Sequence, residues 1–182
     1  MGAIYLIDGY NLLHAMGVLS GRVGPNGLEK ARARLLGLLA GAFGEGGHAV
    51  TVVFDAANAP RGAAEALEFR GIQVRFAVRQ EEADDLIEEL LRRDSAPRRV
   101  TVVSDDHRLH RAARRRGCRV QGCDEFLGWL DRHRRRARHS SESPEEQARA
   151  PGRDAQHWLA EFADLADDPD FRELFAPYDF EI

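Results

Sequence analysis

The chain has 182 residues, of which 43% are hydrophobic, and this is enough for one α/β domain with an extension. It contains no run of about 18 uncharged apolar residues, so we expect no membrane-spanning segment. The first residues lack a basic stretch ahead of an apolar one, which disfavours a signal peptide. The two cysteines, Cys118 and Cys123, do not suggest a disulfide framework, so we expect a reduced, cytoplasmic setting.

The net charge of −4 is distributed unevenly along the chain. Residues 140–182 contain 12 acidic and 3 basic side chains, a net of −9, so residues 1–139 hold 18 acidic and 23 basic ones, a net of +5. Of the 26 basic residues, 25 are Arg and one, Lys30, is Lys. Codon bias is the simpler explanation of this preference, although planar guanidinium groups also suit phosphate binding.

Strand-like and helix-like patterns alternate along the chain. In chain order, the first half predicts a strand at 3–7, a helix at 28–43, a strand at 49–54, a short helix at 63–69 and a strand exposed on one face at 72–78. The second half predicts a helix at 82–93, a strand at 99–104, a helix at 109–116, a strand at 119–121 and a helix at 124–138. A polar linker at 139–152 and an acidic tail at 153–182 with a short amphipathic helix are expected to follow the domain at 1–138.

Three aspartates follow predicted strands in a regular way. Asp8 and Asp105 come directly after the first and fourth strands, and Asp84 lies in the first turn of the helix after the third. Strands separated by helices predict a parallel sheet with right-handed crossovers, and functional residues of such sheets lie at the carboxyl ends of the strands. We therefore expect all three carboxylates at one edge of the sheet.

Clustered carboxylates repel one another unless cations neutralise them. Mg²⁺ and Mn²⁺ prefer oxygen ligands, and in proteins they activate water and stabilise charge on a transferring phosphoryl group. Each aspartate taken alone is better explained as a helix N-cap. The three together favour a catalytic metal site in which Asp8, Asp84 and Asp105 bind the ion.

Other polar residues flank these positions. Asn11 lies three residues after Asp8, and Gly9 allows a sharp turn between them. The Asn11 amide could orient Asp8 or a metal-bound water in a catalytic role, and it could equally cap a helix that begins at Leu12.

Four more acids are candidates for supporting the metal ligands. Glu88 is four residues after Asp84 and shares its helix face, whereas Asp85 points about 100° away and is expected to be more solvated. Asp106 follows Asp105 directly and either supports the site or caps the next helix. Asp55 ends the second strand, next to the first, and is the fourth candidate.

Four stretches of the chain resemble, in order, the motifs of the YacP-like NYN domain, which belongs to the PIN-like nuclease superfamily. The stretches are Ile-Asp-Gly-Tyr-Asn at 7–11, Val-Phe-Asp-Ala at 53–56, Glu-Ala-Asp-Asp-Leu-Ile-Glu at 82–88 and Val-Val-Ser-Asp at 102–105. The resemblance spans about residues 3–138, and its most specific part is the Asp-Gly-Tyr-Asn opening.

The resemblance implies a PIN-like three-layer α/β domain with a central parallel sheet flanked by helices. It also implies an endoribonuclease that depends on Mg²⁺ or Mn²⁺ and acts on bacterial messenger or structural RNA, in some cases near the ribosome. By motif position, Asp8, Asp84 and Asp105 would be the metal carboxylates with Asn11 beside them. The acidic residues Asp85 and Asp106 depart from the family pattern and leave the ligand in each doublet ambiguous by one residue.

An RNA-cleaving site also needs cations that bind phosphates. Arginines are frequent after the Asp105 motif, and Arg108 and Arg111 are nearest to the acids. We predict that these two bind RNA, with a solvated helix face as the alternative. The acidic tail is a hypothetical competitor for this arginine-rich face, or a link between two subunits of a homodimer.

Two other functional classes were compared with the endoribonuclease. A non-catalytic RNA- or ribosome-binding module on the same fold would bind RNA without the acids, and the intact acid set argues against it. A phosphatase or nucleotide-binding protein on a Rossmann-like sheet would show a glycine-rich loop or an Asp-x-Asp motif after the first strand. Here Asp8 is followed by Gly9 and Tyr10, which disfavours that class.

Overall fold

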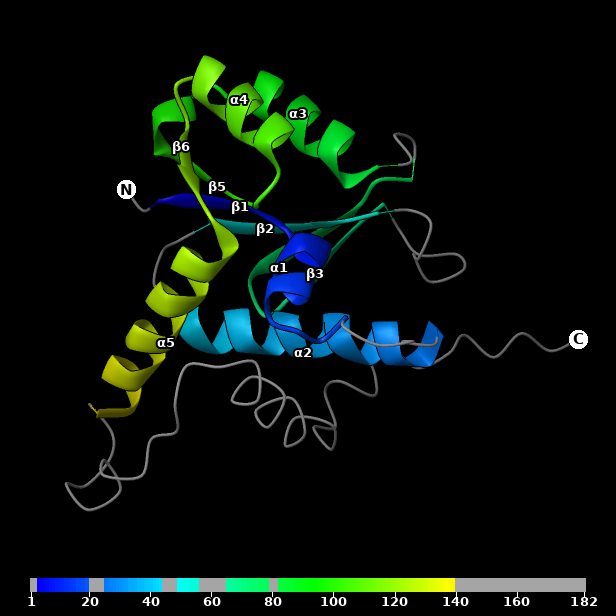
Figure 1. Cartoon of the computed structure of the whole chain (residues 1–182), viewed down its shortest axis with the longest axis vertical. Helices are drawn as coiled ribbons and strands as arrows, with labels where there is room; N and C mark the ends of the chain where they lie inside the picture. The colour runs from blue at the N-terminus through cyan, green and yellow to red at the C-terminus, as the bar shows by residue number, and fades with distance from the viewer. Residues whose placement is uncertain (1–2, 20–24, 44–48, 56–64, 79–81, 140–182) are drawn as a thin grey trace, which may run out of the picture.

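A computed structural model describes residues 3–19, 25–43, 49–55, 65–78 and 82–139. Its centre is a six-stranded sheet in the order β3-β4-β2-β1-β5-β6 (Figure 1). The strands are β1 (Ile4–Asp8), β2 (Ala49–Phe54), β3 (Ala66–Phe69), β4 (Ile72–Phe76), β5 (Val100–Val103) and β6 (Arg119–Gln121). All neighbouring strands pair in parallel except β3, which is antiparallel to β4.

Helices cover both faces of the sheet, so the domain has the three predicted layers (Figure 1). One face packs against α1 (Gly9–Ala15), α2 (Pro25–Phe43) and α5 (Cys123–His139). The other face packs against α3 (Ala83–Arg93) and α4 (His107–Arg115). A short 3-10 turn, η2 (Pro97–Arg99), leads into β5. None of the helices in the described ranges is both long enough and apolar enough to cross a lipid bilayer.

The alternation of side chains along each strand builds the two halves of the core. Ile7 of β1 faces the core under α1, α2 and α5, and its neighbour Leu6 faces the core under α3 and α4. Every residue of β5 is buried, as expected of a central parallel strand that is covered on both sides. Because β1 lies between β2 and β5, its last residue, Asp8, is at the middle of the carboxyl edge of the sheet.

The prediction of a short helix at 63–69 is wrong where the structure describes that segment. Residues 66–69 form β3, which continues through Arg70 and Gly71 into β4 as a hairpin. Both turn residues have positive φ, 47° and 82°, which matches the right-handed twist of the two strands. Phe69 is buried on one face of the strand while Glu68 on the other face is exposed and accepts a hydrogen bond from Gln73. A short apolar run carries too little periodicity to separate helix from strand.

The remaining predicted elements are present, with ends that shift by a few residues. The main addition is α1, because the sequence suggested only that a helix could begin near Leu12, whereas the helix begins directly at Gly9. The predicted linker at 139–152 and tail at 153–182 lie outside the described residues, apart from the last residue of α5.

Candidate active site at the carboxyl edge of the sheet

Asp8 ends β1 and begins α1. It is buried, with 6% of its surface exposed, and its Oδ1 accepts a hydrogen bond from the backbone N–H of Asn11 at 3.0 Å. Asp8 is therefore the N-cap of α1, and the alternative that Asn11 caps a helix from Leu12 is excluded. The chain passes from β1 into α1 without a loop, and this junction needs glycine at position 9, because a Cβ there would lie 2.2 Å from Cε1 of the Phe54 ring.

Asn11 and Ser104 connect Asp8 to the end of β5. Asn11 Oδ1 accepts the backbone N–H of Asp105 at 3.2 Å, and it also accepts the Cys123 thiol at 3.7 Å. Ser104 is fully buried, and its Oγ donates to Asp8 Oδ2 at 3.4 Å and accepts the backbone N–H of Asp106 at 3.0 Å. These contacts fix the two strand ends relative to each other.

The two members of the 105–106 doublet have different surroundings. Asp105 is exposed, and its Oδ1 accepts the backbone N–H of Cys123 at 2.8 Å, at the first residue of α5. Asp106 caps α4 by accepting the backbone N–H of Arg108, and its charge raises the pKa of Asp84. Asp106 is thus the member of the doublet that is coupled to Asp84, and the assignment of Asp105 as a metal ligand stays a prediction.

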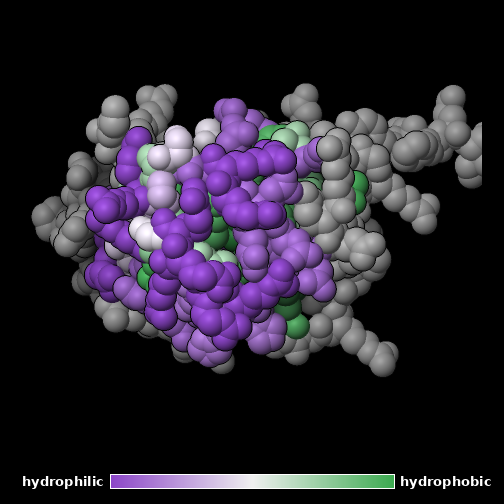
Figure 2. Space-filling model, turned by 90° about the horizontal axis from the view of Figure 1, so that it is seen from above, coloured by the Kyte–Doolittle hydropathy of each residue, from purple (hydrophilic) through white to green (hydrophobic). Residues whose placement is uncertain are grey.

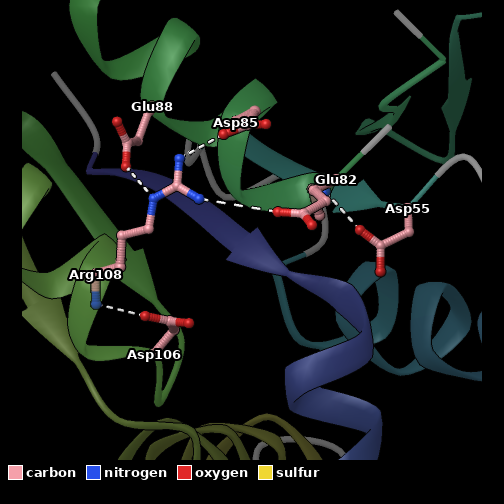
Figure 3. Close-up of polar contacts among 7 residues, drawn as sticks. Asp55, Glu82, Asp85, Glu88, Asp106 and Arg108 are labelled. Atoms are coloured by element: carbon pink, nitrogen blue, oxygen red, sulfur yellow. Dashed lines mark hydrogen bonds and ion pairs between the residues drawn. The ribbon is translucent and has the colours of Figure 1, made fainter. Parts of the chain in front are cut away.

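Asp55 positions the helix that carries Asp84. It directly follows β2, and its Oδ1 accepts the backbone N–H of Ala83, the first residue of α3 (Figure 3). Glu82, the N-cap residue of that helix, makes no side-chain capping bond, so Asp55 supplies the acceptor from a neighbouring strand. Asp84 is half-buried in the first turn and comes within electrostatic range of Asp8 and Asp55.

Asp8, Asp55, Asp84 and Asp106, which we call the acid cluster, interact unfavourably when all are ionised. Burial raises the pKa of Asp8 to about 6, and the charge of Asp55 adds to the effect, although hydrogen bonds from Asn11 and Ser104 oppose it. Burial also raises the pKa of Asp84 to about 6, followed by the charges of Asp106 and Asp8, while Arg108 opposes the rise. The cluster therefore holds more negative charge than the described residues around it compensate.

A second group of carboxylates, which also belongs to the start of α3, is compensated by an arginine. Arg108 of α4 reaches across to α3, where its Nε lies 2.9 Å from Glu88 Oε1 and its Nη2 pairs with Asp85 (Figure 3). Its Nη1 is 3.9 Å from Glu82 Oε2. These arginine-bound acids raise the pKa of Arg108 above its already high ordinary value. Asp85 is thus ion-paired rather than only solvated. Arg108 is paired with protein carboxylates, whereas Arg111, which is also exposed, forms no ion pair with a described residue.

The chemistry of the acid cluster fits a hard divalent cation. Its donors are all carboxylate oxygens, and Mg²⁺ commonly binds through one or two carboxylates while water and substrate phosphates complete its shell. The described residues hold no group of three or more acids, histidines or cysteines that could enclose a metal ion as it stands. Asp8 and Asp84 come from different elements and repel each other across the edge, because the charge of Asp8 raises the pKa of Asp84.

Three contributors were not identified as site residues from the sequence. Ser104 immediately precedes Asp105 and is fully buried. Its place at the end of an apolar predicted strand was the sequence signal that could have identified it. Cys123 donates to both Asp105 and Asn11, and burial together with the nearby carboxylates raises the pKa of its thiol. Glu82 pairs with Arg108, a contact across 26 positions that no local pattern reveals.

His110 bonds through Nε2 to the Ser104 carbonyl oxygen at 2.6 Å, which gives it a structural role.

Comparisons with known proteins identify the family to which this fold belongs. Residues 5–164 match the model of the YacP-like NYN domain, a match that extends past the motif-bearing residues 3–138. The crystal structure of Rae1 (YacP) from Bacillus subtilis is similar with 27% identity and a TM-score of 0.62, over 75% of this chain and 78% of that one. A point mutant of the same Bacillus subtilis protein gives 28% identity and a TM-score of 0.59, over 78% of this chain and 85% of that one. No curated protein matches the chain significantly. The expected resemblance is therefore confirmed, and the chain belongs to the YacP-like NYN domain family, a nuclease-type domain of the PIN-like fold.

Proposed function

We propose that the protein is an endoribonuclease that hydrolyses RNA phosphodiester bonds with the help of a divalent cation, Mg²⁺ or Mn²⁺. The observation that carries the proposal is the uncompensated acid cluster at the carboxyl edge of the sheet, in a chain of a nuclease-type family. A bound divalent ion supplies charge neutralisation and a usable water nucleophile near neutral pH. Membership of the family and the all-oxygen donor set both support this interpretation.

The residues divide into binding and positioning roles in the proposed reaction. Asp8 and Asp84 would hold the cation, with Asp105 as the predicted third carboxylate and Asp106 as the alternative from the same doublet. Asn11 and Ser104 hold Asp8 and the 105–106 segment in place through the hydrogen bonds described above. Asp55 accepts the backbone N–H at the start of α3 and thereby helps to position Asp84 relative to the carboxyl edge of the sheet.

The direct test is RNA cleavage by the purified full chain. We expect a mixed RNA pool to be cut with Mg²⁺ or Mn²⁺, and cutting to stop with a chelator and with Asp8→Asn. Asn retains the shape and the N-cap acceptor of Asp8 but removes its charge, so the fold should persist. RNA binding without cleavage under any divalent ion would favour a non-catalytic RNA-binding module instead.

The 105–106 doublet can be resolved by paired variants. Asp105→Asn and Asp106→Asn each remove one charge, and the true ligand is the one whose loss raises the concentration of Mn²⁺ needed for half-maximal cleavage. Calorimetric titration with Mn²⁺ alone gives a second readout. If neither variant changes Mn²⁺ affinity, Asp8 and Asp84 bind the ion without a third carboxylate from this segment.

A further inference from the structure

The segment from α4 to β6 contains many arginines and no acid. Between His107 and Gly122 there are six arginines, and two of them have clear partners. Arg108 binds the acids of α3, and Arg116 donates to the main-chain oxygens of Leu91 at 3.0 Å, Arg92 at 3.3 Å and Asp94 at 3.0 Å. Arg119 acts electrostatically on Tyr5. The other three arginines therefore set the charge of the α4 surface.

Arg111, Arg114 and Arg115, which we call the arginine ridge, are all exposed. Within the described ranges none of their guanidinium groups makes a hydrogen bond or an ion pair with another residue. Their spacing of three and four residues places them as neighbours on the helix surface. Leu109, Ala112 and Ala113 form the opposite, buried side of α4. The ridge is thus a one-sign surface on the outer side of the helix.

The ridge begins beside the acid cluster. Asp106 caps the first turn of α4, and Arg111 comes one turn later, so the ridge runs from the carboxyl edge of the sheet along the helix. Figure 2 shows the molecule from above the view of Figure 1, in which α3 and α4 form the top layer, and this face is largely hydrophilic. A strand of RNA with one phosphodiester at the acid cluster would have neighbouring phosphates within reach of this surface.

An ordinary solvated face accounts poorly for the pattern. Arg111 and Arg115 are four residues apart, and like charges at that spacing destabilise a helix by a few tenths of a kcal/mol. Soluble surfaces generally intersperse both signs of charge, as α3 does with four acids and two arginines. Three of these acids, Asp85, Glu88 and Glu89, are paired with Arg108 or Arg93 rather than with the ridge. Cationic side chains that have no partner among the described residues, and that lie beside an acidic centre, point to an anionic ligand.

We infer that the arginine ridge binds the phosphate backbone of the RNA strand that enters the acid cluster. The inference rests on the proposed function for its ligand class. It also changes the set of arginines expected to bind RNA. Arg111 remains in that set, whereas Arg108 is assigned instead to the ion pairs with α3. Binding through phosphates is sequence-independent and depends steeply on salt, since each contact releases counterions.

The test measures RNA affinity in chelator, where binding is separated from cleavage. A mixed-sequence, dye-labelled single-stranded RNA is titrated by fluorescence anisotropy with the full chain at several salt concentrations. The variant Arg111→Gln/Arg114→Gln/Arg115→Gln is compared with Arg92→Gln/Arg98→Gln/Arg132→Gln, a control with the same loss of charge at other exposed sites. Thermal midpoints verify that both variants fold.

We expect the ridge variant to bind about 10- to 100-fold more weakly and the slope of log Kd against log salt to decrease by about 2. The matched control should change Kd by less than about 3-fold, and Lys at the three ridge positions should restore most of the salt slope. An unchanged Kd and slope, as expected if the ridge instead held the acidic residues 140–182 of the same chain, would overturn the inference. Equal weakening by the control would also overturn it.

The RNA-binding result can be interpreted whether or not the chain cleaves RNA. Ridge-dependent RNA binding by a chain that cleaves nothing with any divalent ion would retain the inference and remove the nuclease proposal. Chelator-sensitive cleavage with ridge-independent binding would do the reverse.

Discussion

Two groups of carboxylates at the same edge of the sheet differ in how their charge is balanced. Glu82, Asp85 and Glu88 surround one guanidinium group, and the resulting network joins α3 to α4. The acid cluster lies next to them and forms no ion pair with any described residue, and the pKa values of Asp8 and Asp84 rise to about 6. The contrast separates adjacent residues of one helix, since Asp85 forms an ion pair with Arg108 and Asp84 has a raised pKa.

The sharpest test of this contrast exchanges adjacent acids for amides. Asp84→Asn should lower kcat/KM for RNA cleavage by about 1,000-fold, the scale expected when a group that stabilises transition-state charge is lost. Asp85→Asn should lower it by less than about 10-fold, the low end of effects for residues that orient metal ligands. Single-turnover cleavage at saturating Mn²⁺ compares them. Equal losses would show that Arg108 does not separate the two acids functionally.

A second test removes the cation that balances the other group. Arg108→Gln should lower kcat by about 10- to 100-fold through displacement of α3, with little change in KM, and Arg108→Lys should recover part of the loss. This is the signature of a positioning residue. A large change in RNA affinity and salt slope with unchanged kcat would instead support the sequence-based prediction that Arg108 binds phosphate.

A third test disturbs the β1–α1 junction that positions Asp8. Gly9→Ala should destabilise the fold by about 1–3 kcal/mol, because the added methyl group overlaps the buried Phe54 ring. Gly41→Ala in α2 is the matched control, since nothing lies within 4 Å of its Cβ position, and it should stabilise by about 0.5–1 kcal/mol. Urea unfolding measures both, and equal stability of the two variants would contradict the close approach.

The smallest expected effect concerns pH in the absence of divalent ions. Because the pKa values of Asp8 and Asp84 are raised to about 6 in the folded chain, the folded state binds more protons than the unfolded one between about pH 4 and pH 6. Their contribution to stability is complete below the unfolded pKa and is lost as pH rises through the folded pKa. The thermal midpoint of Asp8→Asn relative to the unmodified chain should therefore increase from pH 4 to pH 7.

Added Mg²⁺ or Mn²⁺ is the control for the pH experiment. A cation bound by Asp8 and Asp84 relieves the repulsion, so the advantage of Asp8→Asn at pH 7 should disappear with saturating metal. An advantage that is the same at every pH and metal concentration would show that Asp8 carries no unfavourable charge.

The position of the site was predictable because it depends on chain order. Asp8 and Asp84 follow alternating strands and helices, and the parallel sheet brings such positions to one edge. The alternative that Asp106 caps the next helix is confirmed, whereas the approach of Asp105 to the start of α5 was not predictable because it depends on tertiary packing. The pairing of Asp85 with Arg108 joins residues 23 positions apart and needs the packing of α3 on α4. The hairpin at 66–76 was missed because its turn, Arg70-Gly71, was not recognised beside a short apolar run.

The buried thiol of Cys123 has a practical consequence for studying the protein in solution. Its hydrogen bond to Asn11 and its raised pKa keep it in the unreactive protonated form at neutral pH. Alkylating reagents should therefore label it only when the start of α5 separates from the β1–α1 junction. The labelling rate at this position would report how often that junction opens, without the introduction of a foreign probe.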